Sequence, residues 1–180
     1  MPHPALLIID MINTFDFEGG QALARRAQDA GRRIATLRRR WHAAGAPVVY
    51  VNDNFMQWQA DFSELVAVCM HEGMRGAEIA RLLQPGPDDY FVLKPKHSAF
   101  LATPLEVLLA KLGARELVLT GVATDSCILA TALDAHMREF TIRVPRDCVA
   151  ALTPARTERA LALLRDACAA DVRSSRTLRP

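Results

Sequence analysis

Short apolar runs alternate along the chain with longer amphipathic segments. The runs that favour strands cover 5–10, 47–52, 90–93, 116–120 and 140–144, with a short last strand beginning at 172. Apolar residues at steps of three and four predict helices over 21–44, 63–70, 76–83, 103–112, 125–137 and 153–169. Because the strands are apolar throughout and separated by helices, we expect one domain over 1–180 with six parallel strands in a doubly wound sheet.

Two helix starts have clear local signals. Thr103, Pro104 and Glu106 are typical of an N-cap, a proline in the first turn and a capping-box acid. Thr124 or Asp125 is expected to cap the helix that follows the strand over 116–120. The sequence therefore predicts that residue 127 lies in a first helical turn.

Composition excludes several classes of protein. With 51% hydrophobic and 23% charged residues the chain is neither disordered nor of low complexity. No apolar run reaches the roughly 18 residues of a membrane span. The N-terminal run Ala5–Ile9 lacks a basic flank and is closed by Asp10, so it is not a signal peptide. We expect a cytoplasmic protein without a membrane partner.

The basic residues do not indicate a nucleic-acid partner. The net charge is only +2, although 19 of the 22 basic residues are arginine. One cluster, at positions 32, 33, 38, 39 and 40, lies on a segment whose apolar residues form a helical stripe. No aromatic stacking platform accompanies it. We interpret these arginines as the solvated side of that helix.

Candidate chemistry gathers where the predicted strands end. In parallel sheets ligands bind beyond the carboxyl ends of the strands. Asp10 follows four apolar residues, a setting that raises the pKa of a carboxyl group, although an aspartate there is also a common turn residue. Lys94, one of only three lysines, follows another strand. Together with Cys127 they place an acid, a base and a thiol at one edge of the sheet.

The four cysteines form no metal-binding or disulfide pattern. Cys69, Cys148 and Cys168 are interpreted as buried apolar residues. Cys127 lies where helix N–H groups favour an anion, which lowers the pKa of a thiol. We expect it to be the most acidic of the four thiols and the first to be alkylated, although a small core residue is the simpler alternative.

Three motifs together resemble the isochorismatase-like cysteine hydrolases. They are Asp10-Met-Ile-Asn-Thr-Phe15, Lys94-Pro-Lys-His-Ser-Ala-Phe100 and Gly121-Val-Ala-Thr-Asp-Ser-Cys127. Their order and spacing match, and the similarity covers essentially the whole chain. The resemblance implies a Rossmann-like three-layer α/β/α fold with a six-stranded parallel sheet, and a catalytic triad of Asp10, Lys94 and Cys127. It also implies a homo-oligomer.

The resemblance further implies an oxyanion hole. In the family the peptide bond before Ala123 is usually cis, and this turns the N–H groups of Ala123 and Cys127 toward an oxyanion. The aromatic and amide residues that flank the motifs are candidates for substrate binding, and each could equally serve core or interface packing. These candidates are Phe15, Asn54, Trp58 and Phe100. Trp58 and Phe100 are also candidate anchors of a subunit interface.

The chain departs from the metal-binding members of the family. Nicotinamidases carry an Asp-x-His motif after the second strand, and here Asn54 stands where that histidine is expected. Asp53 and His71 alone do not supply the three or four ligands of a zinc site. We therefore expect no metal and no other cofactor.

The retained thiol favours acyl chemistry. The first hypothesis is hydrolysis of a small amide, carbamoyl or ureido C–N bond in a small-molecule substrate, through a Cys127 thioester. Asp10 carries the proton and Lys94 stabilises the local charges. One alternative is an isochorismatase-type vinyl-ether hydrolase, in which Asp10 acts as the acid and Cys127 is incidental. The other is a non-catalytic member of the fold that binds a ligand.

Overall fold

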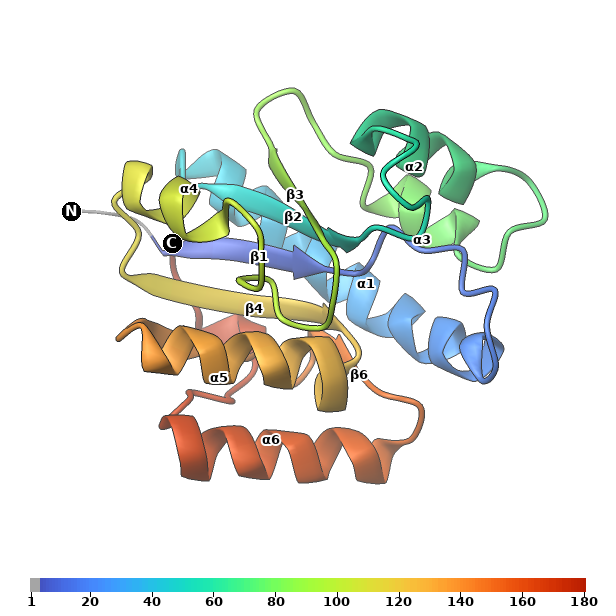
Figure 1. Ribbon diagram of the computed structural model, residues 1–180. Coiled ribbons are helices and arrows are strands. Elements are labelled where there is room, and N and C mark those ends of the chain that lie inside the picture. Colours follow the sequence, from blue (N-terminus) through green and yellow to red (C-terminus); the bar gives the residue numbers. More distant parts are fainter. Residues whose placement is uncertain (1–3) are drawn as a thin grey trace.

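The computed structural model describes residues 4–180 as a parallel sheet between two layers of helices (Figure 1). The sheet has six strands, in the order β3-β2-β1-β4-β5, with β6 also paired to β4. The strands are β1 (Ala5–Ile9), β2 (Val48–Asp53), β3 (Tyr90–Lys94), β4 (Glu116–Val122), β5 (Thr141–Arg143) and β6 (Val149–Ala150). The helices are α1 (Gly20–Ala43), α2 (Phe62–Met70), α3 (Ala77–Leu82), α4 (Leu105–Lys111), η1 (Thr124–Ile128), α5 (Leu129–Met137), α6 (Pro154–Cys168) and η2 (Ser175–Thr177).

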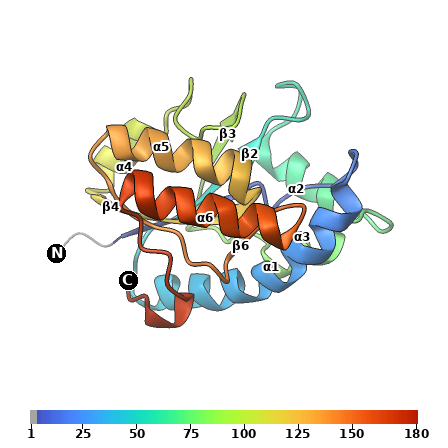
Figure 2. The ribbon, with the colours of Figure 1, turned by 90° about the horizontal axis from the view of Figure 1, so that it is seen from below.

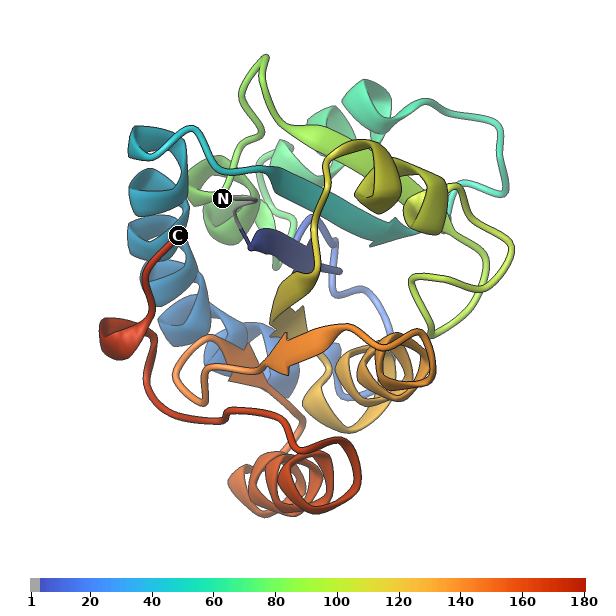
Figure 3. The same ribbon diagram turned by 90° about the vertical axis from the view of Figure 1, so that its left-hand side faces the viewer.

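Each face of the sheet has its own apolar core. Side chains alternate along a strand, so Leu6 and Ile8 of β1 pack toward α1, α2 and α3, whereas Leu7 and Ile9 pack toward α4, α5 and α6. Figure 3 shows α1 on one side of the sheet and α4 and α5 on the other, and Figure 2 shows α5 and α6 lying side by side. Burial on both faces explains why the central strand β1 is apolar throughout.

The predicted architecture is confirmed, with one strand misplaced. Five predicted strands overlap β1 to β5, and every predicted helix has a counterpart. The last strand was expected at Val172, but β6 lies earlier, at Val149–Ala150. Asp171 forms only an isolated bridge with Arg143. Because β6 has only two residues, the apolar pattern of the sequence could not indicate it as a strand.

The expected helix caps differ from the observed ones. The helix expected from Thr103 begins at Leu105. Its N-cap residue is Pro104, which makes no side-chain capping hydrogen bond. The Thr103 hydroxyl accepts a hydrogen bond from the Leu105 N–H at 3.3 Å, while Glu106 pairs with Arg138. Neither Thr124 nor Asp125 caps the segment before α5. Asp125 pairs instead with Arg156 of α6, so tertiary partners override the local capping signals in both places.

The arginine face of α1 is only partly solvated, contrary to expectation. Arg38 is half-buried and donates to the hydroxyl of Tyr50 and, at 2.7 Å, to the carbonyl of Gln84. Arg40 donates to the carbonyl of Ser175 at 2.9 Å. These two side chains therefore tie α1 to neighbouring segments. No helix within residues 4–180 is long and apolar enough to cross a membrane.

The strand order reverses between β1 and β4. The chain runs from β1 outward to β2 and β3, then returns to place β4 on the other side of β1. Gly121 of β4 pairs with Ile9 of β1 at a φ of +114°, and a Cβ there would lie 2.0 Å from the Ile9 carbonyl oxygen. Only glycine fits this approach. The carboxyl ends of β1 and β4 thus meet at the switch point where ligands bind in such sheets.

Candidate active site

Three candidate catalytic side chains meet beyond the carboxyl ends of β1, β3 and β4. The Nζ of Lys94 lies 2.9 Å from Oδ2 of Asp10 and 3.5 Å from Sγ of Cys127. Lys94 thus lies between the Asp10 carboxylate and the thiol. Residues separated by more than 80 positions in the sequence thus form one continuous network.

Asp10 is the first residue after β1 and is 5% exposed. Its backbone N–H continues the sheet by donating to Val51 at 2.8 Å, while its φ of 53° turns the chain out of the strand direction. Aspartate is one of the few residues that enters this left-handed region readily. Its Oδ1 accepts a hydrogen bond from the Asp53 N–H at 2.7 Å, which leaves Oδ2 for Lys94.

Lys94 is the last residue of β3 and is 1% exposed. Its strand lies two places from β1 in the sheet, so its long stem crosses the end of β2 to reach Asp10. Its own carbonyl accepts from the Asn54 N–H at 3.1 Å, which holds the ends of β2 and β3 together. A buried ammonium needs such a partner, because an unpaired charge in this setting is strongly unfavourable.

Cys127 lies in the single π-helical turn η1, between β4 and α5. The peptide bond between Val122 and Ala123 at the start of this turn is cis. The carbonyl of Ala123 accepts from the N–H groups of Ser126 and Ile128, at 3.1 and 3.2 Å. The prediction of a first helical turn is therefore correct in place, although the turn is wider than an α-helix.

The pKa shifts concern the Cys127 thiol and the Lys94–Asp10 pair beside it. Burial, reinforced by the Asp10 carboxylate, raises the pKa of Cys127 to about 12. Burial also raises the pKa of Asp10, against the opposing effect of Lys94. Burial alone would lower the pKa of Lys94, but Asp10 and Cys127 outweigh it and hold that pKa above its ordinary value. At neutral pH the thiol is therefore protonated, and the 2.9 Å contact pairs the Lys94 ammonium with the Asp10 carboxylate.

The expected acidity of Cys127 is wrong for this resting state. Burial raises the pKa of Cys69 and of Cys148 to about 12 as well, so acidity does not distinguish these thiols. Exposure does, because Cys127 is partly exposed while Cys69, Cys148 and Cys168 are buried. The helix N-terminal effect is outweighed by burial and by the adjacent carboxylate, which the linear pattern did not reveal.

The four candidate substrate residues lie in two different settings. Phe15 is 0% exposed within the core beneath α1, and Phe100 is 6% exposed within the opposite core, against Phe140. Neither is an exposed aromatic, so the interpretation of Phe100 as an interface anchor is wrong. Asn54 and Trp58 belong to the loop after β2, where the Trp58 N–H donates to Asn54 Oδ1 at 2.9 Å.

These two loop residues differ in exposure and in hydrogen bonding. Trp58 is 70% exposed, whereas Asn54 is buried. Among the residues that the structure describes, the buried Nδ2 of Asn54 has no hydrogen-bond partner. The Nδ2 of Asn54, next to the end of β3, can therefore donate a hydrogen bond to a bound molecule.

His97 and Ser126 also contact the thiol, and sequence reasoning did not select them. The Nδ1 of His97 lies 3.8 Å from Cys127 Sγ and 3.2 Å from Ser126 Oγ. Both residues stand inside the quoted motifs, three positions after Lys94 and one before Cys127. The position of His97, three residues after a strand-end lysine, is the feature of the sequence that could have indicated its place near the thiol.

The donor set does not fit the metal site of the nicotinamidase members. Across 4–180, no three His, Cys, Asp or Glu side chains are placed to hold one ion. His71 ends α2, and its Nδ1 contacts the Glu72 carbonyl at 2.9 Å. Asn54 occupies the place of the expected histidine and is bonded to Trp58.

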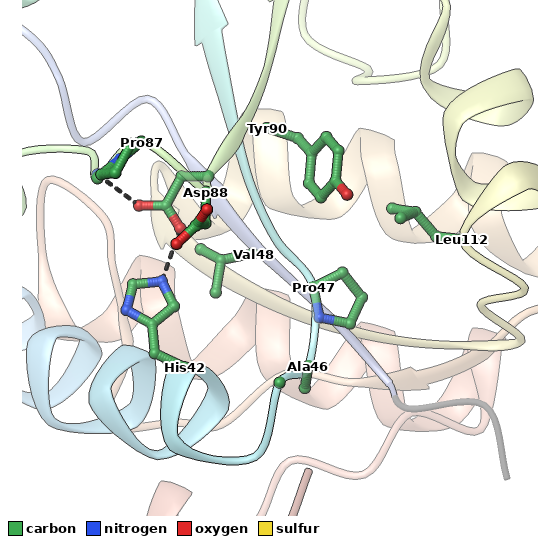
Figure 4. Close-up of a pocket in the computed structure, with 11 residues that line it drawn as sticks. His42, Ala46, Pro47, Val48, Pro87, Asp88, Tyr90 and Leu112 are labelled. Atoms are coloured by element: carbon green, nitrogen blue, oxygen red, sulfur yellow. Dashed lines mark hydrogen bonds and ion pairs between the residues drawn. The ribbon is translucent and has the colours of Figure 1, made fainter.

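A separate cavity of about 610 Å³ lies at the opposite, amino end of the sheet (Figure 4). It is lined by the start of β2, the start of β3 and the ends of α1 and α4. His42 Nε2 contacts Asp89 Oδ1 there at 2.7 Å. None of the triad residues lines this cavity.

Comparison with known proteins places this chain in a family. The Isochorismatase domain profile matches residues 4–177. The uncharacterized isochorismatase family protein YaaI of Bacillus subtilis (strain 168) is 39% identical over 168 residues, covering 93% of this chain and 92% of that protein. The ureidoacrylate amidohydrolase RutB of Enterobacter sp. (strain 638) is 27% identical over 163 residues, covering 77% of this chain and 71% of that protein.

A solved structure agrees with these relatives. The N-carbamoylsarcosine amidase of Thermoplasma acidophilum is 26% identical, superposes with a TM-score of 0.74 and matches over 99% of both chains. The chain belongs to the isochorismatase family. It is a hydrolase of that family, built on the Rossmann-like α/β fold that the motifs implied.

Proposed function

We propose that this protein is a cysteine hydrolase that cleaves a small amide, carbamoyl or ureido C–N bond through a thioester on Cys127. The contact of Lys94 Nζ with both Asp10 Oδ2, at 2.9 Å, and Cys127 Sγ, at 3.5 Å, is the observation that carries the proposal. A nucleophile, a proton acceptor and a fixed cation within one buried network are the parts that thiol catalysis requires. The amidohydrolase and amidase relatives support this class of bond.

In the first step Asp10 accepts the thiol proton while Cys127 Sγ attacks the substrate carbon. Burial raises the pKa of Asp10, and a carboxylate with a raised pKa is a stronger base than an exposed one. Lys94 remains charged and favours the thiolate as it forms. The proton on Asp10 then passes to the leaving nitrogen, so ammonia or an amine departs neutral.

As the thiol attacks, negative charge develops on the carbonyl oxygen of the substrate. This oxygen needs hydrogen-bond donors to stabilise it. We assign this role to the backbone N–H groups of Ala123, which precedes the turn, and of Cys127, which lies within it. Preorganised donors of this kind contribute about 3–4 kcal/mol each to transition-state stabilisation.

Asn54 is the substrate-orienting residue that the structure supports best. Its buried Nδ2 has no partner within 4–180, so an acceptor oxygen on the substrate would satisfy it. Leaving a buried donor unpaired costs about 1–3 kcal/mol, which the bound substrate would recover. Trp58, on the same loop and 70% exposed, would cover the bound molecule from the solvent side.

The test is a product assay on purified protein. We expect ammonia release from at least one member of a panel of ureidoacrylate, N-carbamoylsarcosine and simple primary carboxamides, and no release by Cys127→Ala. Activity should survive exhaustive chelation, because no metal is required. Pyruvate formation from isochorismate that is retained by Cys127→Ala would instead support the vinyl-ether alternative and reject the thioester route.

A further inference from the structure

His97 is a proton-carrying neighbour of the thiol that the attack step does not use. Its Nδ1 lies 3.8 Å from Cys127 Sγ and 3.2 Å from Ser126 Oγ, and its ring is exposed. Lys94 contacts the same sulfur but is 1% exposed, and its partner Asp10 is 5% exposed. The thiol therefore has proton carriers on two sides, one buried and one facing solvent.

The loop that carries His97 is anchored to the helix that follows the nucleophile. The hydroxyl of Ser98 donates to the carboxylate of Asp134, and the N–H of Ala99 donates to Thr131 Oγ1 at 3.0 Å. Both acceptors belong to α5, which continues directly from the Cys127 turn. Because the histidine loop and the nucleophile are held by one helix, their separation is fixed by the fold.

Hydrolysis of a thioester needs a base on the side from which water arrives. Asp10 is poorly placed for this second step, because it is 5% exposed and water hardly reaches it. His97 is accessible and touches the sulfur. Imidazole is also the side chain most often used as a general base.

Resting on the proposed thioester route, we propose that His97 is the general base of deacylation. A water oxygen attacks the thioester carbonyl carbon while one water proton moves to His97 Nδ1. The C–S bond breaks and the sulfur leaves with the bonding pair. The imidazolium returns its proton to Sγ, which regenerates the thiol and releases the acid product. Asp10 is thus the base of thioester formation, and His97 is the base of thioester hydrolysis.

The surrounding groups are compatible with this role. With its proton on Nε2, the neutral ring presents a lone pair on Nδ1 toward Ser126 Oγ and Cys127 Sγ. Lys94 faces the same sulfur from the buried side. Asp125, two residues before Cys127, is already paired with Arg156. No acidic side chain contacts the His97 ring among residues 4–180, so the ring is not committed to an ion pair.

The two half-reactions separate with p-nitrophenyl acetate as the probe. Its leaving group needs no acid, so wild-type protein should release a burst of about one p-nitrophenolate per site and then turn over at the deacylation rate. His97→Gln should keep the burst and lower the steady rate about 100-fold, in line with loss of a general base. Intact-mass measurement should show an acetyl group accumulating on that variant, and hydroxylamine should restore its turnover.

Controls keep the outcomes distinct. His136→Gln, at an exposed histidine in the last turn of α5, should behave as wild type. A His97→Gln protein that deacetylates within twofold of wild type would overturn the role of His97, as would one that loses burst and steady rate equally. A burst that persists in Cys127→Ala would overturn the thioester route itself, and the His97 role with it.

Discussion

The two ends of the sheet each hold a basic side chain in short contact with a buried carboxylate, yet only one has the features expected of an active site. At the carboxyl end Lys94 and Asp10 are 2.9 Å apart, with side chains 1% and 7% exposed. At the amino end His42 and Asp89 are 2.7 Å apart, with side chains 39% and 1% exposed. The distances are similar, so the difference lies in burial and in neighbours.

The neighbours decide the chemistry. Asp89 Oδ2 accepts from the Gly86 N–H at 2.8 Å, so the amino-end carboxylate closes a turn and is paired with a histidine that water reaches. Asp10 faces a buried ammonium and a thiol, and its pKa is raised by burial. The amino end has a cavity of about 610 Å³, but the carboxyl end has the proposed nucleophile. A cavity with a histidine–carboxylate contact is therefore weaker evidence for catalysis than a thiol in contact with a buried charged pair.

The largest effect should come from Cys127→Ala. Removing the nucleophile should lower kcat for C–N hydrolysis by about 10⁴-fold or more, since the remaining groups cannot form the thioester. Circular dichroism should show an unchanged fold, because only a small, partly exposed side chain is lost. Retention of wild-type turnover on the best amide substrate would show that the carboxyl end does not act through its thiol.

Asp10→Asn should lower turnover by about 10²–10⁴-fold and have the opposite effect on the thiol. The carboxylate raises the pKa of Cys127, so its removal leaves burial opposed by Lys94 and the pKa falls. At fixed pH the thiolate fraction rises about tenfold for each unit of that fall. Iodoacetamide should therefore modify Cys127 faster in the variant, as read by mass spectrometry of the alkylated peptide.

The other cysteines provide an internal reference for this measurement. Cys69, Cys148 and Cys168 are buried and should be labelled more slowly than Cys127 in both proteins. Slower labelling of Cys127 in Asp10→Asn than in wild type would mean that the carboxylate activates the resting thiol as a base, contrary to the charge states inferred above.

The sequence predicted the general plan of this site better than its charge states. Strand-end positions located Asp10, Lys94 and Cys127, because a parallel sheet brings all its carboxyl ends to one edge. The network that sets their pKa values depends on contacts between residues 84 and 33 positions apart, which no local pattern contains. The same reason explains the missed His97, whose proximity to the thiol is created by the anchoring of its loop to α5.

Local signals failed where tertiary contacts compete with them. Glu106 has the spacing of a capping box but pairs with Arg138, and Arg38 has the spacing of a solvated helix face but reaches Tyr50. Phe15 and Phe100 flank the motifs in sequence and pack into opposite cores in space. Proximity to a motif along the chain therefore says little about which side of the sheet a residue occupies.

The pH dependence of kcat/KM should be a smaller effect with a definite sign. This parameter reports the steps through ammonia release, in which Asp10 must be ionised. Burial raises the pKa of Asp10 above 3.8, so activity should fall with decreasing pH through a limb centred above that value. The pKa of Cys127 is raised to about 12, so no loss should occur near pH 9. A limb at or below pH 3.8, with the protein shown to be folded there, would contradict the burial of the active carboxylate.

The smallest effect should come from His42→Ala, which tests the amino end of the comparison directly. The His42 side chain is 39% exposed, so its pair with Asp89 is screened by water and should contribute about 0–1 kcal/mol to the free energy of unfolding. Thermal melting should shift by no more than about 2–4 °C. Asp89 keeps its bond to the Gly86 N–H, so the turn before β3 should persist and the position of Lys94 at the far end of that strand should not change. Turnover and the alkylation rate of Cys127 should match wild type. A loss of turnover without a loss of stability would show that the two ends of the sheet are coupled, and that the cavity at the amino end acts on the reaction from a distance.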